Sequence, residues 1–482
     1  MMNKEKTIGW NFDNSYSNLP KSFIYEISPV PVKRPELVIL NHDLADQMGL
    51  NFSNVDNEQL AKMFSGNLLP KGSKSLAQAY AGHQFGHFTM LGDGRAVLLG
   101  EHISKSNQRL DIQFKGSGQT PFSRNGDGRA ALGPMLREYL ISEAMYSLNI
   151  PTTRSLAVVK TGENVIREKP LQGAILTRVA SSHIRVGTFQ FIRTRENLDE
   201  LNTLVNYTIK RHYPEISKSK NNAYDLLSKL IDKQIELVVN WMRVGFIHGV
   251  MNTDNMAISG ETIDYGPCAF MDSYNLGTCF SSIDHMGRYA YGNQPAITKW
   301  NLARFAECLL TLINPNKDDA LKMATELIDK FDKIYEEKWF NMMKSKLGLI
   351  GDDKEDNLII FELLEIMKKQ ELDYTNTFLF LMDHEIDDKK SYQNEEFDNW
   401  KMKWQKRLTK DSKNLMELNN PVIIPRNHNV ENVLKSAENN DLTPFNDLLQ
   451  ALKNPYTNQK VLTKYQSPPP KSDEKYQTFC GT

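Results

Sequence analysis

His248-Gly-Val-Met-Asn-Thr-Asp254-Asn255, followed nine residues later by Asp264-Tyr-Gly266, is the most informative segment of the chain. Asp and Asn are common in ordinary turns, but a short apolar run between these two motifs predicts a strand hairpin that brings Asn255 and Asp264 together. Carboxylate and amide oxygens are the ligands that Mg²⁺ takes from proteins, usually together with substrate phosphates. We therefore expect Asn255 and Asp264 to hold a divalent cation, which leaves Asp254 as a candidate base.

A glycine-rich turn lies upstream, where Leu91-Gly92-Asp93-Gly94-Arg95-Ala96 precedes an apolar run. Two glycines let the backbone approach an anion, and an arginine can grip phosphate oxygens in pairs, although Gly-Asp-Gly is also typical of a plain hairpin turn. A second stretch, Gly126-Asp127-Gly128-Arg129-Ala130, repeats the pattern. The repeat predicts donors on more than one side of a phosphate group.

A strand lysine and a helix glutamate complete the set. The alternating segment 112–115 predicts a strand that ends on Lys115, and residues 134–148 predict a helix that offers Glu138 and Glu143. Glu138 is the acid expected to orient Lys115 by an ion pair. A protein-kinase-like nucleotide site has the same order of parts: a glycine-rich turn, a strand lysine, a helix glutamate, a catalytic loop and a metal-binding Asp segment. Two features differ from ordinary kinases, because Asp254 and Asn255 are adjacent here and no G-x-G-x-x-G occurs.

Several long motifs together resemble the selenoprotein O family. Besides the two turns and the 248–255 loop, they are Tyr80-Ala-Gly-His-Gln-Phe-Gly86, Lys115-Gly-Ser-Gly-Gln-Thr-Pro-Phe-Ser-Arg124 and Ser182-His-Ile-Arg-Val-Gly-Thr-Phe189. The resemblance extends from about residue 11 to the end of the chain. It implies a protein-kinase-like fold and a protein adenylyltransferase, which moves AMP from ATP to protein hydroxyl groups with the nucleotide reversed relative to kinases.

The resemblance also implies a role for each site residue. Asn255 and Asp264 would hold Mg²⁺ or Mn²⁺, and Asp254 would accept the proton. Read from their surroundings alone, Arg178 and Arg185 are more typical of structural arginines that bridge two lobes than of phosphate ligands. The residues implied to bind ATP are Gly92, Gly94, Arg95, Lys115, Asp127, Gly128, Arg178, Arg185 and, through the metal, Asp264.

Three function classes follow. We favour a transferase that attaches AMP to Ser, Thr or Tyr hydroxyls of proteins and releases pyrophosphate, with UTP as a further possible donor. The alternatives are a phosphoryl-transferring kinase and a non-catalytic nucleotide-binding pseudokinase switch, because the same groups would serve the γ-phosphoryl equally well.

Composition limits the remaining classes. The 482 residues are 40% hydrophobic and 24% charged, with a formal net charge of −1. Such a balance gives no general attraction to nucleic acid, and no apolar run reaches the ~18 residues of a membrane span. We expect a cytoplasmic protein whose partners are ATP and protein substrates, without nucleic acid or membrane.

The pattern of elements predicts an α+β, bilobal protein-kinase-like fold. Its expected parts are an N-terminal extension (1–70), a strand-rich nucleotide-binding lobe (71–180), a helical lobe with the catalytic loop and metal site (181–466) and a flexible tail (467–482). Within them we expect a helix over 35–48, a hairpin that joins 156–159 to 165–166, a long helix ending at Gly245, and amphipathic helices over 300–346, 356–372 and 394–418.

Four cysteines show no CxxC pair and no secreted disulfide pattern. Cys480 lies on a tail that follows Pro468-Pro-Pro470, at the position where some family members carry selenocysteine. Cys279 follows Asp264 where a kinase would carry its activation segment. We predict a reversible disulfide between Cys279 and Cys480, because a long tail would let both thiols meet.

Overall fold

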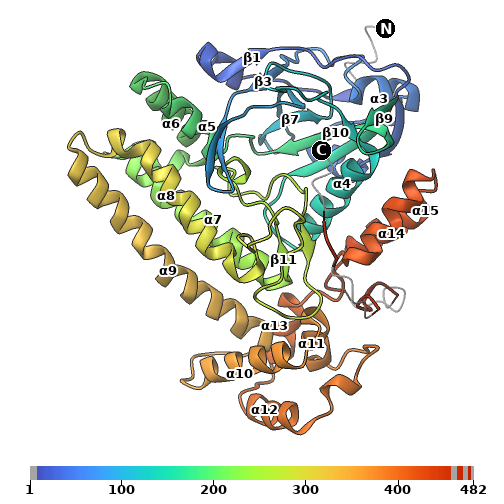
Figure 1. Cartoon of the computed structure of the whole chain (residues 1–482), viewed down its shortest axis with the longest axis vertical. Helices are drawn as coiled ribbons and strands as arrows, with labels where there is room; N and C mark the ends of the chain where they lie inside the picture. The colour runs from blue at the N-terminus through green and yellow to red at the C-terminus, as the bar shows by residue number, and fades with distance from the viewer. Residues whose placement is uncertain (1–7, 458–463, 471–475, 479–482) are drawn as a thin grey trace.

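The molecule has a strand-rich region that contains the main sheet and a mainly helical region (Figure 1). The computed structural model describes residues 8–457, 464–470 and 476–478. The predicted α+β class is confirmed, because an antiparallel sheet occupies one end and the helices after residue 185 occupy most of the other. Across the described ranges, no helix has both the length and the apolar composition needed to cross a membrane.

Eight strands form the main sheet in the described part of the chain, in the order β1-β3-β6-β7-β10-β9-β2 with β8 paired to β10. Lys115 at the end of β7 lies opposite Ala96 at the start of β6, so the strand lysine is beside the glycine-rich turn. The strands are β1 Ile24–Glu26, β2 Glu36–Leu40, β3 Leu76–Gln78, β6 Ala96–Ile103, β7 Arg109–Lys115, β8 Ala130–Ala131, β9 Arg154–Ile166 and β10 Pro170–Ala180.

Helices pack on both faces of this sheet. Ile175 and Leu176 are neighbours in β10 and therefore point to opposite faces. Ile175 belongs to a buried cluster with helices α2 (His42–Met48) and α3 (Asn57–Phe64), whereas Leu176 belongs to one with helix α4 (Leu132–Ser147). The face covered by α4 is the one from which Glu138 reaches the site.

The hairpin expected between 156–159 and 165–166 is absent. Both segments belong to one long strand, β9, which pairs with β10 along its whole length. The register shifts where residues 161–163 lie opposite Gly173, so Thr161-Gly162-Glu163 makes a bulge within the strand instead of a turn. The hairpin turn comes later, at 167–169.

The helix expected over 35–48 is also only half right. Residues Glu36–Leu40 form strand β2, which pairs with β9, and only His42–Met48 is helical. Leu, Val and Ile fit a half-buried strand edge. Asn41 then starts the helix, because its side-chain oxygen accepts the backbone N–H of Leu44 at 3.1 Å.

The helical region is built around α7, which ends at Gly245 as predicted. Asn221 caps its first turn, and Gly245 ends it in the left-handed conformation at φ +71°. Helices α8 and α9 pack beside α7. The helices of this region are α5 Val186–Arg193, α6 Leu198–His212, α7 Asn222–Val244, α8 Gln294–Ile313, α9 Lys317–Leu347, α10 Asp356–Lys369, α11 Tyr374–Leu381, α12 Glu395–Gln405 and α13 Ser412–Asn419.

The last two helices, α14 (Asn427–Glu438) and α15 (Thr443–Leu452), return to the strand-rich region and pack against α4 (Figure 1). Two short antiparallel strand pairs lie outside the main sheet: β4 (Ala81–Gln84) pairs with β5 (His87–Met90), and β11 (Phe246–Ile247) pairs with β12 (Ala269–Phe270) across the 248–268 loop. Short 3-10 turns are η1 Tyr16–Asn18, η2 Lys21–Phe23, η3 Pro214–Ile216, η4 Thr253–Asn255, η5 Tyr291–Asn293 and η6 Lys390–Tyr392.

Candidate active site

A cleft of about 710 Å³ lies where the end of the sheet faces the 248–267 loop. Residues far apart in the chain form its wall, and the set includes both glycine turns, the strand lysine and the Asp-Asn loop. The site residues expected from the sequence that line it are Gly92, Gly94, Arg95, Lys115, Asp127, Gly128, Arg178, Arg185, Asp254, Asn255 and Asp264. Glu138 lies behind the wall, bonded to Lys115.

The loop that carries Asp254 is fixed at both ends. Strands β11 and β12 pair on either side of it, so the chain leaves and re-enters the core at one place. His248 is buried inside the loop, where its Nε2 is 2.9 Å from the carbonyl oxygen of Ile263 and its backbone N–H donates to Gln294. His248 therefore shapes the loop by hydrogen bonding and lies outside the cleft lining.

The hairpin expected between Asn255 and Asp264 does not form. Ala257 instead bridges to Arg185, and Thr262 bridges to Thr152. Each half of the segment thus pairs with a different neighbour, because backbone groups of 184–186 and 151–153 accept and donate there. The two metal-ligand candidates still face one cleft, but tertiary pairing and not a local turn brings them there.

The β4–β5 hairpin holds the Asp254 turn from the other side. The backbone N–H of His83 donates to Thr253 Oγ1 at 2.8 Å, and that of Phe85 donates to Asn252 Oδ1 at 3.1 Å. A Cβ atom at Gly82 would collide with the Asp254 carboxylate. The glycine in the Tyr80–Gly86 motif is therefore required by close packing on the candidate base, a role that the sequence alone did not reveal.

Asp254 is a buried carboxylate with an oxygen that has no hydrogen-bond partner among the described residues. Its side chain is almost fully buried, and its Oδ1 makes no hydrogen bond within the described ranges. Burial raises the pKa of Asp254 to about 6, against the opposing effect of Arg185. A carboxylate in such a place is a stronger base than an exposed one and has an oxygen free to accept a proton.

Asn255 and Asp264 offer oxygen atoms to the cleft. The Asn255 amide nitrogen donates to the Val250 carbonyl oxygen at 3.0 Å, which turns its oxygen away from that partner. Asp264 is held at φ +64° with its side chain 23% exposed. No group of three or more His, Cys, Asp or Glu side chains with metal-site geometry occurs in the part of the chain that the structure describes. The pair thus fits a hard cation that completes its shell with phosphate oxygens and water.

Three cations surround Asp264. Lys115 Nζ lies 2.8 Å from its Oδ1, Arg178 contacts the same oxygen, and Arg185 is 3.7 Å from its Oδ2. Burial acts to raise the pKa of Asp264, but the positive charges of Arg178, Lys115 and Arg185 outweigh it and hold that pKa well below its ordinary value. Asp264 therefore stays ionised in the cleft.

Glu138 is the second counter-charge of this cluster. Its Oε2 accepts from Lys115 Nζ at 2.7 Å, and its Oε1 contacts Arg178. Burial opposes its ionisation, yet Arg178 and Lys115 lower the pKa of Glu138. Glu143, the other helix acid considered from the sequence, pairs with Arg154 at 2.6 Å and does not reach Lys115. The cleft lining as a whole carries seven Lys and Arg side chains against four Asp side chains, which leaves a positive excess for an anionic ligand.

The glycine turns pack more tightly than their sequence suggested. Cβ atoms at Gly92 and Gly94 would collide with Phe122, so these glycines let the 118–128 segment fold over the first turn. Asp127 forms an ion pair with Arg167 at 2.8 Å. Asp127 thereby holds Arg167 on the cleft wall, and its expected contact with ATP stays a prediction.

Among the cleft residues that the sequence did not assign to the site are Tyr80, Asp93, Arg124 and Arg167. Arg167 is at the β9–β10 turn, where nothing in the local sequence points to a ligand. Asp93 was seen only as part of a turn, but it is buried and accepts the backbone N–H of Gln78 at 3.0 Å. Tyr80 and Arg124 belong to motifs that carry the family resemblance, and that resemblance could have indicated them as cleft residues.

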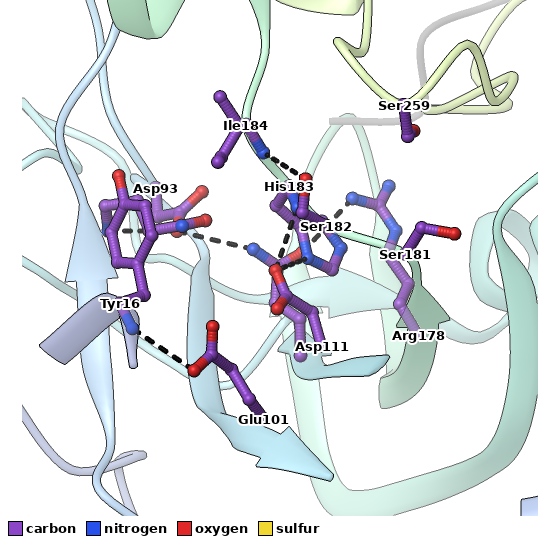
Figure 2. A network of polar contacts seen from close by, with 12 residues as sticks. Tyr16, Asp93, Glu101, Asp111, Arg178, Ser181, Ser182, His183, Ile184 and Ser259 are labelled. Atoms are coloured by element: carbon purple, nitrogen blue, oxygen red, sulfur yellow. Dashed lines mark hydrogen bonds and ion pairs between the residues drawn. The ribbon is translucent and has the colours of Figure 1, made fainter. Parts of the chain in front are cut away.

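Arg185 reaches the cleft from a segment that is held by buried polar contacts (Figure 2). Its guanidinium lies 4.3 Å from the centre of the Tyr80 ring, and its Nη1 donates to the Asp254 carbonyl oxygen at 3.2 Å. Arg178 comes from strand β10. The two arginines thus enter from different elements, and both contact Asp264.

Cys279 lies outside the cleft lining. Its Sγ is 3.4 Å from Asp284 Oδ2, and burial together with the Asp284 charge raises the pKa of its thiol to about 11. Cys480 lies outside the described residues, so the predicted disulfide stays a prediction. Thr478 forms a parallel bridge to Ser281, which places the described end of the tail beside the segment that carries Cys279.

Comparisons with known proteins match the chain along nearly its whole length. The sequence model of a family described as protein adenylyltransferase SelO matches residues 6–453. Three relatives carry the name protein nucleotidyltransferase YdiU. The one from Pelagibacter ubique is 65% identical over 99% of this chain and 100% of its own length. Those from Nitrosococcus oceani and Bacillus thuringiensis are each 55% identical, over 99% and 100% of this chain and 99% and 100% of their own.

Proposed function

Because the chain belongs to the SelO family of protein adenylyltransferases and is therefore a protein nucleotidyltransferase, we propose that the cleft around Lys115, Asp254 and Asp264 is where AMP passes from ATP to a protein. A nucleotide and a protein are its substrates. The acceptors in this proposal are Ser, Thr and Tyr hydroxyls, and UTP is a second donor that the same groups could bind.

One observation carries the proposal: a cleft with a positive excess is lined by a buried carboxylate, Asp254, whose pKa is raised. The cations Lys115, Arg178 and Arg185 suit the negative charge of a triphosphate. The Asp254 carboxylate, which lines the cleft and has a raised pKa, suits the proton of an incoming hydroxyl. Both needs belong to a single transfer reaction.

The reaction proceeds by in-line displacement at the α-phosphorus. Asp254 accepts the proton of the acceptor hydroxyl while the hydroxyl oxygen forms a bond to the α-phosphorus. The bond between that phosphorus and the pyrophosphate oxygen breaks at the same time. Lys115, Arg178 and Arg185 stabilise charge that gathers on the leaving pyrophosphate. Asn255 and Asp264 would hold Mg²⁺ or Mn²⁺, whose positive charge, when bound, neutralises phosphate oxygens.

We also propose that the fold is bilobal and protein-kinase-like. In support, the strand lysine, the helix glutamate, the Asp-Asn loop and the Asp-Tyr-Gly segment surround one cleft between the sheet and the helical region. The adjacent Asp254 and Asn255 and the missing G-x-G-x-x-G separate this site from that of ordinary kinases. In the proposal the α-phosphate and not the γ-phosphate lies at Asp254.

Labelled nucleotides test the reaction. Incubation of the protein and a mixed protein acceptor with ATP labelled at the α-phosphorus should give labelled acceptor and free pyrophosphate, because AMP is the transferred group. ATP labelled at the γ-phosphorus should leave the acceptor unlabelled. Acceptor labelling from the γ-position would contradict the proposal in favour of a kinase. Nucleotide binding without either transfer would instead indicate a pseudokinase switch.

A further inference from the structure

The segment Ser181–Arg185 connects β10 to α5 and carries Arg185 into the cleft. Side chains that none of the proposed steps uses hold part of its backbone (Figure 2). Asp111, in the middle of β7, is the centre of these contacts. Its carboxylate is 1% exposed, so its partners decide whether its charge is tolerated.

Asp111 binds the segment through His183. Its Oδ2 accepts the backbone N–H of His183 at 2.8 Å and lies 3.1 Å from the Nδ1 of the same residue (Figure 2). Two bonds from one carboxylate oxygen to one residue fix both the peptide plane and the ring. The His183 carbonyl oxygen, on the far side of that residue, accepts the Nε of Arg185 at 3.2 Å. The position of His183 therefore sets the direction of the Arg185 side chain.

Arg211 on α6 supplies the counter-charge. Its Nη2 donates to Asp111 Oδ1 at 2.6 Å and to the Ser181 carbonyl oxygen at 2.6 Å. Arg211 also contacts Glu101 on β6, whose carboxylate accepts the backbone N–H of Tyr16 at 3.1 Å. The segment is thus tied to α6, to the sheet and to the N-terminal part of the chain by one buried network.

We infer that Asp111 is a positioning residue, which acts through His183 to set the Arg185 guanidinium against the nucleotide phosphates and Asp264. The inference rests on the proposed function and extends it to a residue outside the cleft lining. Arg185 needs such support because a planar guanidinium binds well only in one orientation. Its guanidinium also contacts the Tyr80 ring, the Asp254 carbonyl oxygen and Asp264. Its backbone bonds to Thr188 and bridges to Ala257, so the His183 carbonyl oxygen is the contact through which Asp111 acts on the side chain.

Replacement of Asp111 by Asn tests this role. An Asn side chain has the same size but turns an N–H₂ group toward donors, so it cannot accept from His183 and Arg211 together. Arg211 keeps Glu101 as its counter-ion, which favours folding of the variant. The measurement is a double-mutant cycle of Asp111→Asn with Arg185→Ala in the full-length protein, read by equilibrium binding of a non-hydrolysable ATP analogue.

We expect Asp111→Asn to weaken analogue binding about tenfold in the otherwise unchanged protein. In the Arg185→Ala background the same substitution should weaken binding less than about twofold, because the Arg185 contact through which Asp111 acts is already lost. A purely structural role predicts equal factors in both backgrounds, and that result would overturn the inference. If Asp111→Asn unfolds, His183→Gln replaces it in the same cycle, because it removes the ring contact and keeps the backbone bond. Equal factors for that variant would also overturn the inference.

Glu143→Gln is the matched control. It breaks another buried acid–arginine pair, with Arg154, in which each side chain is 11% exposed and neither lines the cleft. Glu143→Gln should weaken analogue binding by the same small factor in the protein with Arg185 and in the Arg185→Ala variant. Absence of analogue binding by the unchanged protein would contradict the proposed function itself, so the two failures are distinguishable.

Discussion

Asp264→Ala is expected to lower AMP transfer by about 10³-fold or more, because it removes a charged oxygen ligand from the proposed metal site. The substitution also removes a counter-charge from Lys115, Arg178 and Arg185. Glu138 still contacts Lys115 and Arg178. The cations are then free to hold the triphosphate in unproductive positions. Transfer of α-label and analogue binding should both be measured, and transfer should fall far more than binding.

Asp272→Ala provides the control for this prediction. Asp272 is 20% exposed, close to the 23% of Asp264, and it too pairs with a buried arginine, Arg426, at 2.6 Å. It does not line the cleft, and Arg426 keeps Asp373 as a second partner. Its transfer rate should stay within about twofold of the unchanged protein. Equal activity of Asp264→Ala and Asp272→Ala would reject the metal-site assignment.

Asp254→Asn is expected to slow transfer by about 10² to 10⁴-fold, the range found when a general base is lost. Asn has nearly the shape of Asp, so the close packing against Gly82 is kept. Nucleotide binding should therefore change little, while the rate at saturating ATP falls. Single-turnover transfer of α-label separates these two effects.

The comparison for Asp254 is made within the same loop. Asn252→Ala removes hydrogen bonds that hold the loop, to the Phe85 backbone and the Tyr289 hydroxyl, but removes no acid. If loss of loop order explained the effect of Asp254→Asn, thermal unfolding would shift in both variants. Full activity of Asp254→Asn at saturating ATP would show that another group accepts the proton.

Local sequence was enough for those parts of the site that follow from a single element. Lys115 ends an alternating strand, and Glu138 lies on an apolar helix, so their elements were correctly expected. The end of α7 at Gly245 followed from its apolar spacing and the glycine cap. These are cases in which periodicity or a capping residue already contains the answer.

Tertiary pairing decided the rest. Thr161-Gly162-Glu163 has the composition of a turn, but β10 pairs on both sides of it and makes it a bulge. Asn255 and Asp264 reach one cleft through separate bridges to Arg185 and Thr152, neither of which is close in sequence. Arg167 joins the cleft through Asp127, forty residues earlier in the chain. Contacts of this range leave no periodic trace in the chain.

A crystal structure with a non-hydrolysable ATP analogue and Mn²⁺ would show whether the nucleotide and the metal occupy the proposed site. The account predicts Mn²⁺ bound to the side-chain oxygens of Asn255 and Asp264, with the triphosphate beside Lys115, Arg178 and Arg185 and the α-phosphorus next to Asp254. Mn²⁺ would be located by its anomalous scattering. A nucleotide bound away from Lys115 and Asp264, or one with its γ-phosphorus at Asp254, would contradict the account.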